Sequence, residues 1–137
     1  LSSPKSMVLD ILEEGDEREI TLVYGARCKS ELYYDDLFSE LVEKHNNFHY
    51  VVALSEPKQD DDWTGACCYV HELAEQYFEK KFAGYKAYLC GPPPMIDGCI
   101  TALMQGRLFE EHIFMENFFT AADSAKPARR SALFKKF

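Results

Sequence analysis

Apolar and polar positions along the chain follow two different periods, which predicts a mixed α/β fold. Short apolar runs bounded by polar residues or glycine predict buried strands, and stretches with apolar positions three and four apart predict helices. Four strands are expected, at residues 20–24, 48–54, 87–90 and about 112–116. Four helices are expected, over residues 4–14, from residue 30 or 34 to 44, over 70–82 and over 94–105.

The residues between these elements agree with that order. Gly25 ends the first strand, and Ser3 is the expected N-cap of the first helix, ahead of Pro4 in its first turn. Gly84 is expected to close the third helix. Helices that alternate with strands are typical of a parallel sheet with helices on both faces. The sequence therefore predicts an α/β fold of this kind.

The clearest break in the pattern lies at residues 88–95, Tyr-Leu-Cys-Gly-Pro-Pro-Pro-Met. A strand that turns into a helix through such a segment is expected to leave backbone N–H groups and a positive helix end at the strand's carboxyl edge, where open α/β sheets bind nucleotides. Cys90 lies at the mouth of this predicted site. Gly91 lets a backbone approach a ligand closely, although a rigid Gly-Pro turn is a second interpretation, and both can hold together.

Composition narrows the function classes. The 137 residues carry a net charge of −8, which argues against a nucleic-acid partner but not against a dinucleotide held by backbone amides. No apolar run approaches the ~20 residues of a membrane span, and the first residues do not form a signal peptide. The five cysteines, two of them adjacent, make a poor disulfide framework and lack the spacing of a zinc site. Reduced thiols, no metal site and a cytoplasmic location are expected.

Several segments together resemble the ferredoxin–NADP reductase-like flavoprotein reductases. Besides residues 88–95 they are Leu1-Ser2-Ser3-Pro4, Tyr24-Gly25-Ala26-Arg27, Met115-Glu116-Asn117-Phe118-Phe119 and the tail at 131–137. The sequence particularly resembles the reductase components of multicomponent phenol hydroxylases and related aromatic monooxygenases. The resemblance covers essentially the whole chain, but only the last domain of such a reductase, the one that binds the pyridine nucleotide.

This resemblance implies a Rossmann-like, five-stranded nucleotide-binding half whose central first strand and glycine-rich turn precede Leu1. The chain is therefore expected to be an N-terminally truncated NAD(H)-binding domain over residues 1–120 with a C-terminal extension over 121–137. The apolar residues of the extension, Leu133, Phe134 and Phe137, are expected either to fold back on the domain or to dock on another one.

The resemblance also implies a function and partners. The full protein would pass a hydride from NADH to FAD and electrons through a 2Fe-2S centre to a di-iron oxygenase that hydroxylates phenol or a related aromatic compound. The FAD-binding and ferredoxin domains of the same protein are the implied partners, and the chain is not expected to turn over alone. The alternative is a non-catalytic nucleotide-binding or protein-interaction module of the same fold.

Finally, the resemblance implies site residues. Cys90 would lie beside nicotinamide C4 and position it without acting as a covalent nucleophile; a small buried core residue is the alternative. Glu116 and Phe118 would lie beside the flavin and nicotinamide, or else form an ordinary strand end. Cofactor-binding residues would further include Ser2, Ser3, Gly25, Arg27, Gly91, Pro92, Pro93 and Met95.

Two of these roles concern the adenosine side of the nucleotide. Ser2 and Ser3 are the phosphate-side candidates, since helix N–H groups there would face the pyrophosphate. Arg27 would stack on adenine or contact phosphate, with a plain surface arginine as the alternative. The acidic run at residues 60–62 would repel an added 2′-phosphate, so NADH is expected rather than NADPH.

Overall fold

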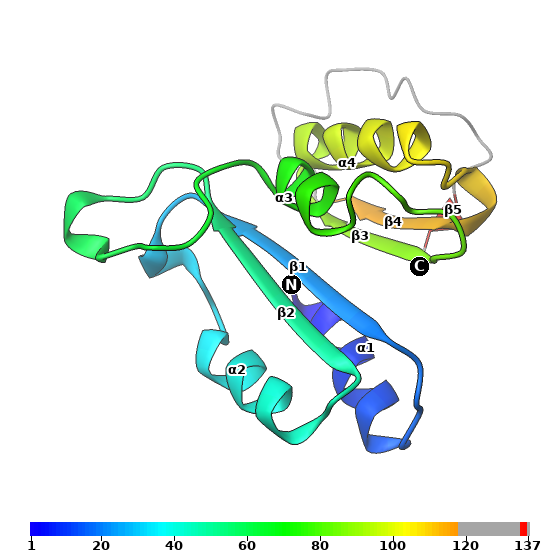
Figure 1. Ribbon diagram of the computed structural model, residues 1–137, viewed down its shortest axis with the longest axis horizontal. Coiled ribbons are helices and arrows are strands. Elements are labelled where there is room, and N and C mark those ends of the chain that lie inside the picture. The colour runs from blue at the N-terminus through cyan, green and yellow to red at the C-terminus, as the bar shows by residue number, and fades with distance from the viewer. Residues whose placement is uncertain (118–134, 137) are drawn as a thin grey trace. The chain divides into compact units, whose positions relative to one another are not determined.

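The computed structural model describes residues 1–117 and 135–136. The chain divides into two compact units, one over residues 6–74 and one that joins residues 1–5 to residues from 75 onward. The elements of each unit are labelled in Figure 1. Two helices cross the division in sequence, α1 (Ser2–Glu13) and α3 (Val70–Tyr77).

The unit at residues 6–74 is built on two parallel strands, β1 (Ile20–Ala26) and β2 (Phe48–Leu54). Helix α2 (Asp35–Lys44) connects them and packs against β2 (Figure 1). Acidic residues in the first turn of α2 and Lys44 in its last turn complement the helix dipole. Phe38 of α2 is fully buried and packs against Tyr50 of β2, with ring centroids 5.2 Å apart, which anchors the helix to the strand.

In the described part of the second unit, three parallel strands lie in the order β3 (Ala87–Gly91), β4 (Ile113–Asn117) and β5 (Lys135–Lys136). Helix α4 (Pro93–Gln105) connects β3 to β4 and packs on both strands (Figure 1). The core comprises Ile96, Ile100, Leu103, Leu108, Ile113 and Met115. Because side chains alternate along a strand, burial of Ile113 and Met115 leaves Phe114 and Glu116 on the opposite face of β4.

The predicted mixed α/β fold with parallel strands is confirmed. Strand β2 has the predicted bounds, and β1, β3 and β4 agree with prediction within two residues. The third helix was predicted too long: it ends at Tyr77 rather than residue 82, because Glu79 and Lys80 adopt left-handed backbone angles, with φ of 52° and 57°. Three short 3₁₀ helices occupy Lys29–Glu31, Gln59–Asp61 and Glu110–His112.

The first helix begins earlier than predicted. It starts at Ser2, and the Lys5 N–H donates to the Leu1 carbonyl at 3.0 Å. Ser3 therefore lies inside the first turn of α1, and its prediction as the N-cap was wrong. This shift by two residues turns the Ser3 side chain from a cap into a group that can contact another element.

The described strands form two sheets rather than one. Strand β1 pairs with β2, and β3 pairs with β4, but no pairing joins β1 to β3 within residues 1–117 and 135–136. Strand β5 was not predicted, since two lysines carry no apolar pattern. It pairs with β4 from within the expected C-terminal extension, whose other residues lie outside the described part of the chain. Among the described helices, none is long and apolar enough to cross a bilayer.

Candidate functional site

Three polar side chains from distant parts of the sequence meet at the carboxyl ends of β3 and β4. Cys90 and Glu116 are opposite one another in the strand register, with Cys90 Sγ 4.0 Å from Glu116 Oε2. The Ser3 hydroxyl, from the first turn of α1, donates a hydrogen bond of 2.6 Å to the same Glu116 oxygen. We call this group the Ser3–Cys90–Glu116 cluster. All three residues belong to one compact unit and are partly buried.

The thiol of the cluster is held in its neutral form. Burial raises the pKa of Cys90 above its ordinary value of 9.0, and the nearby Glu116 carboxylate raises it further. A thiolate is the nucleophilic form of cysteine, so a raised pKa disfavours covalent catalysis. The arrangement instead suits a small, neutral side chain against which a ligand ring can pack.

The turn after β3 differs from its prediction in one respect. Pro92 is the N-cap of α4, and Pro93 and Pro94 occupy its first positions. Because proline has no N–H, Met95 carries the first amide donor of this helix, and the Ile96 N–H already bonds to the Pro92 carbonyl at 3.1 Å. This helix end therefore offers fewer N–H groups than expected.

Gly91 and Met95 lie against each other in the same turn. Gly91 is buried, and a Cβ atom added to it would overlap the terminal Cε methyl of Met95. The thioether of a methionine side chain is flexible and adapts readily to its surroundings. The backbone at Gly91 is thus covered by a side chain that can move aside, which keeps both the rigid-turn and the ligand-approach interpretations compatible with the structure.

The first turn of α1 is the better candidate for an anion site. Ser2 and Ser3 lie in the first turn of α1, where N–H groups have no partner within the helix and the helix dipole favours negative charge. Ser2 is exposed, whereas the Ser3 hydroxyl is used by Glu116. Of the two predicted phosphate-side residues, only Ser2 keeps its side chain available.

In the other unit, Gly25 has a packing role. A Cβ atom at Gly25 would lie 2.8 Å from Val70 Cβ and 3.5 Å from Val70 Cα. Only glycine lets the start of α3 approach β1 so closely. Packing against Val70 thus explains why a glycine stands here. The predicted contact of Gly25 with the adenosine half of a nucleotide stays a prediction.

Arg27, which follows β1, is paired with its own neighbour. Its Nη2 lies 2.6 Å from Glu31 Oε1, and its Nε donates to Glu31 Oε2 at 3.2 Å. The side chain is 71% exposed, so this pair is open to solvent. The hydrogen bond from Arg27 lowers the pKa of the Glu31 carboxyl. A ligand that uses Arg27 must share the guanidinium with Glu31 or displace it.

The acidic loop that follows β2 contacts the turn after β1 that contains Arg27. This contact was not predicted from the sequence. Asp61 Oδ2 accepts hydrogen bonds from the backbone N–H groups of Lys58 at 2.9 Å and Lys29 at 3.1 Å. These bonds to the charged form lower the pKa of Asp61. An acidic residue three positions into a short turn is a recognisable signal for the first contact, but the contact with Lys29 depends on tertiary structure.

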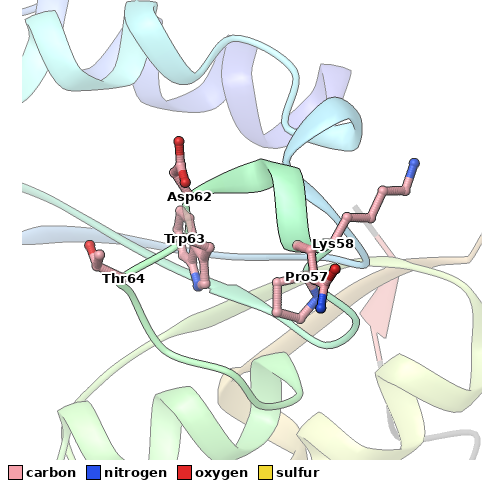
Figure 2. A pocket seen from close by; sticks show the side chains of 6 residues that line it. Pro57, Lys58, Asp62, Trp63 and Thr64 are labelled. Atoms are coloured by element: carbon pink, nitrogen blue, oxygen red, sulfur yellow. The ribbon is translucent and has the colours of Figure 1, made fainter.

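A shallow hollow of about 480 Å³ lies beside this loop. Figure 2 shows its lining side chains, which are Pro57, Lys58, Gln59, Asp62, Trp63 and Thr64. The indole N–H of Trp63 donates to the Ala66 carbonyl at 3.0 Å, as expected of a packed surface aromatic. None of the predicted site residues lines this hollow. Phe118, the remaining predicted site residue, lies outside the described residues.

The comparisons with known proteins agree on one family. Residues 3–100 match the oxidoreductase NAD-binding domain family. The chain is 59% identical over 136 residues to the reductase component DmpP of phenol 2-monooxygenase from Pseudomonas sp. (strain CF600), which covers 99% of the chain and 38% of the relative. It is 56% identical over 135 residues to the phenol hydroxylase P5 protein from Acinetobacter pittii (strain PHEA-2), covering 98% of the chain and 38% of that protein.

A solved structure has the same fold. The Amycolatopsis cytochrome P450 reductase GcoB superposes with a TM-score of 0.72 at 26% identity, over 81% of this chain and 32% of that one. The chain thus spans well under half the length of the relatives it matches.

Proposed function

The chain belongs to the oxidoreductase NAD-binding domain family, and from this we propose that it binds NADH and orients the nicotinamide for hydride transfer to a flavin held by another domain. We extend the proposal to the whole protein: it is the reductase component of a phenol hydroxylase. In it, electrons pass from NADH through FAD and a 2Fe-2S centre to a di-iron oxygenase component. The high identity to two reductase proteins of phenol hydroxylases supports this extension.

The observation that carries the proposal is the Ser3–Cys90–Glu116 cluster at the carboxyl ends of β3 and β4. Open α/β sheets bind their ligands at this edge. A nicotinamide carboxamide offers N–H donors, which suit the Glu116 carboxylate, and a flat ring, which suits the small neutral thiol of Cys90. FAD held by its own domain would supply the hydride acceptor. The residues of this chain position the donor.

The choice of NADH over NADPH is supported by the placement of Asp61. Its carboxylate lies 3.1 Å from the Lys29 amide, in the turn that follows β1 and contains Arg27. That turn is the predicted contact for the adenosine half of the nucleotide. A negative charge fixed there opposes the added 2′-phosphate of NADPH.

The proposed setting is the cytoplasm. All five cysteines of the chain are free, including the adjacent Cys67 and Cys68. Free thiols on exposed positions are usual in a reducing compartment. A cytoplasmic location also suits a reductase that draws on the NADH pool.

The test uses the complete reductase under anaerobic conditions. Addition of NADH should bleach the flavin absorbance, and addition of the oxygenase component and phenol in air should give hydroxylated product. Glu116→Gln should slow the bleaching, whereas Glu14→Gln, which neutralises an exposed carboxylate in the turn after α1, should not. NADH binding without bleaching would favour the non-catalytic alternative, and no binding would contradict the proposal.

A further inference from the structure

We propose that Ser3 is a positioning residue whose hydroxyl holds the Glu116 carboxylate in place at the nicotinamide edge. This inference rests on the proposed function, because it assigns a partner to a residue of the same site. It differs from the sequence-based prediction, in which the Ser3 side chain caps the first helix and the N–H groups of the turn face the pyrophosphate. It also makes the first turn of α1 part of the hydride-transfer site.

The Ser3–Glu116 hydrogen bond has the features of a strong contact. Its oxygen–oxygen distance of 2.6 Å lies in the range of hydroxyl groups that donate to a carboxylate. The two residues are 113 positions apart in the sequence and both are partly buried. A bond that joins a helix start to a strand end therefore fixes the Glu116 side chain against a rigid element.

The distribution of contacts over the two carboxylate oxygens supports a positioning role. Ser3 and Cys90 both lie on Oε2 of Glu116, at 2.6 Å and 4.0 Å. Oε1 is then the oxygen directed to other partners, such as the amide of a nicotinamide. Holding one oxygen fixes the direction of the other, because the carboxylate is planar.

The Ser3 hydroxyl cannot donate a hydrogen bond to Glu116 and to a phosphate at the same time. A serine hydroxyl has a single hydrogen to donate, and in this structure it is donated to Glu116. A phosphate oxygen accepts hydrogen bonds and does not donate them when ionised. The side chain that remains for a phosphate is that of Ser2, together with the backbone amides of the turn.

Loss of the hydroxyl would leave Glu116 loosely held. The remaining contact of Oε2 in the described residues is with the Cys90 thiol, which is a weak donor at 4.0 Å. The glutamate would then sample more rotamers, and a smaller fraction of them would present Oε1 to the nicotinamide. The expected consequence is a slower hydride transfer with little change in nucleotide affinity, since small errors of placement are costly to rate.

The experiment measures flavin reduction by NADH in the complete reductase, by anaerobic stopped flow. Ser3→Ala should lower the limiting rate about tenfold, the factor that corresponds to losing a hydrogen bond to a charged group. The NADH dissociation constant should change by less than about twofold, because binding does not depend on the lost bond. Ser3→Thr keeps the hydroxyl and should recover most of the rate. Ser6→Ala, an exposed serine of the same helix, should leave both quantities unchanged.

A double-mutant cycle separates positioning from general damage. If Ser3 acts through Glu116, Ser3→Ala should have no further effect on the rate in a Glu116→Ala background, where the acceptor of its hydrogen bond is gone. Equal losses in both backgrounds, or weaker NADH binding with an unchanged rate, would overturn the proposal; the second result would return Ser3 to the phosphate. Equal reduction rates for wild type and Ser3→Ala also overturn the role of Ser3 but leave the proposed function intact. Failure of wild-type protein to be reduced by NADH would refute both.

Discussion

The two compact units each present the carboxyl end of a parallel strand pair, and they use it differently. At the end of β3 and β4, the Ser3–Cys90–Glu116 cluster joins three segments that are far apart in the sequence and partly buries them. At the end of β1, the polar contacts are more local: Arg27 pairs with Glu31, four residues on, and both remain accessible to solvent. The first edge is built by tertiary structure and the second mainly by its own loop. The difference suits an edge where atoms react and an edge where a ligand only needs to be held.

The two glycines at these edges show the opposite contrast. Gly25 is packed against the Cα and Cβ atoms of Val70, which cannot move without shifting the helix that carries them. Gly91 is packed against the end of the Met95 side chain, which can rotate away. The edge at β1 is thus rigid at Gly25. The edge at β3 and β4 can open at Gly91, although the Ser3–Cys90–Glu116 cluster beside Gly91 is tightly held.

The largest expected effect is on the chemistry of the first edge. Cys90→Ala in the complete reductase should slow flavin reduction by NADH by about a hundredfold, the cost of misplacing a reacting group by about an ångström. NADH affinity should change far less, because Cys90 packs against one ring of a large ligand. Stopped-flow traces that match wild type would remove Cys90 from the hydride site and weaken the contrast between the edges.

The glycine contrast predicts the next largest effect, on stability. Gly25→Ala should lower the free energy of unfolding by about 1–3 kcal/mol, the usual cost of overpacking a filled interior. Gly91→Ala is the matched control and should cost less, since Met95 can move to make room. Denaturant midpoints of the two variants give the comparison. A Gly91→Ala variant that is the less stable of the two would mean that the first edge is the rigid one.

The sequence could predict the local features of the molecule but not the contacts made by tertiary structure. Strands β1 to β4 and the family resemblance were predicted correctly because apolar runs and short motifs are local signals; the match of residues 3–100 confirms the family. The bond between Ser3 and Glu116 was missed, because hydrogen bonding between residues 113 positions apart leaves no mark on spacing. The end of α3 was missed because left-handed angles at Glu79 and Lys80, a strained state for such residues, depend on tertiary packing.

A smaller effect is expected on nucleotide choice at the second edge. Asp61→Asn removes a charge but keeps an oxygen that accepts from Lys29 and Lys58, so the loop should keep its structure. The ratio of kcat/KM for NADPH to that for NADH should rise about fivefold, as expected from losing about 1 kcal/mol of repulsion between charges in water. Asp10→Asn, on the exposed side of α1, is the control and should leave the ratio unchanged. An unchanged ratio in Asp61→Asn would mean that the second edge does not contact the 2′ position.

The smallest effect should come from the local pair at the second edge, and it depends on pH. The hydrogen bond from Arg27 lowers the pKa of Glu31 below its ordinary value of 4.5. A carboxyl with a depressed folded-state pKa contributes stability that is present above its unfolded value and is lost as pH falls through the folded value. Wild-type protein should therefore lose this contribution below about pH 4.5, and Arg27→Ala should show a slightly shallower loss of stability in that range.

The measurement is the denaturant midpoint at several pH values between about pH 6 and pH 3, where this carboxyl takes up its proton. Lys86→Ala, which removes an exposed positive charge ahead of β3, serves as the control for the change in net charge. The difference between the two variants should be small, because exposed ion pairs contribute little to stability. A large loss of stability in Arg27→Ala at neutral pH would show that this pair holds the loop together. The second edge would then be as structured as the first, and the comparison between them would fail.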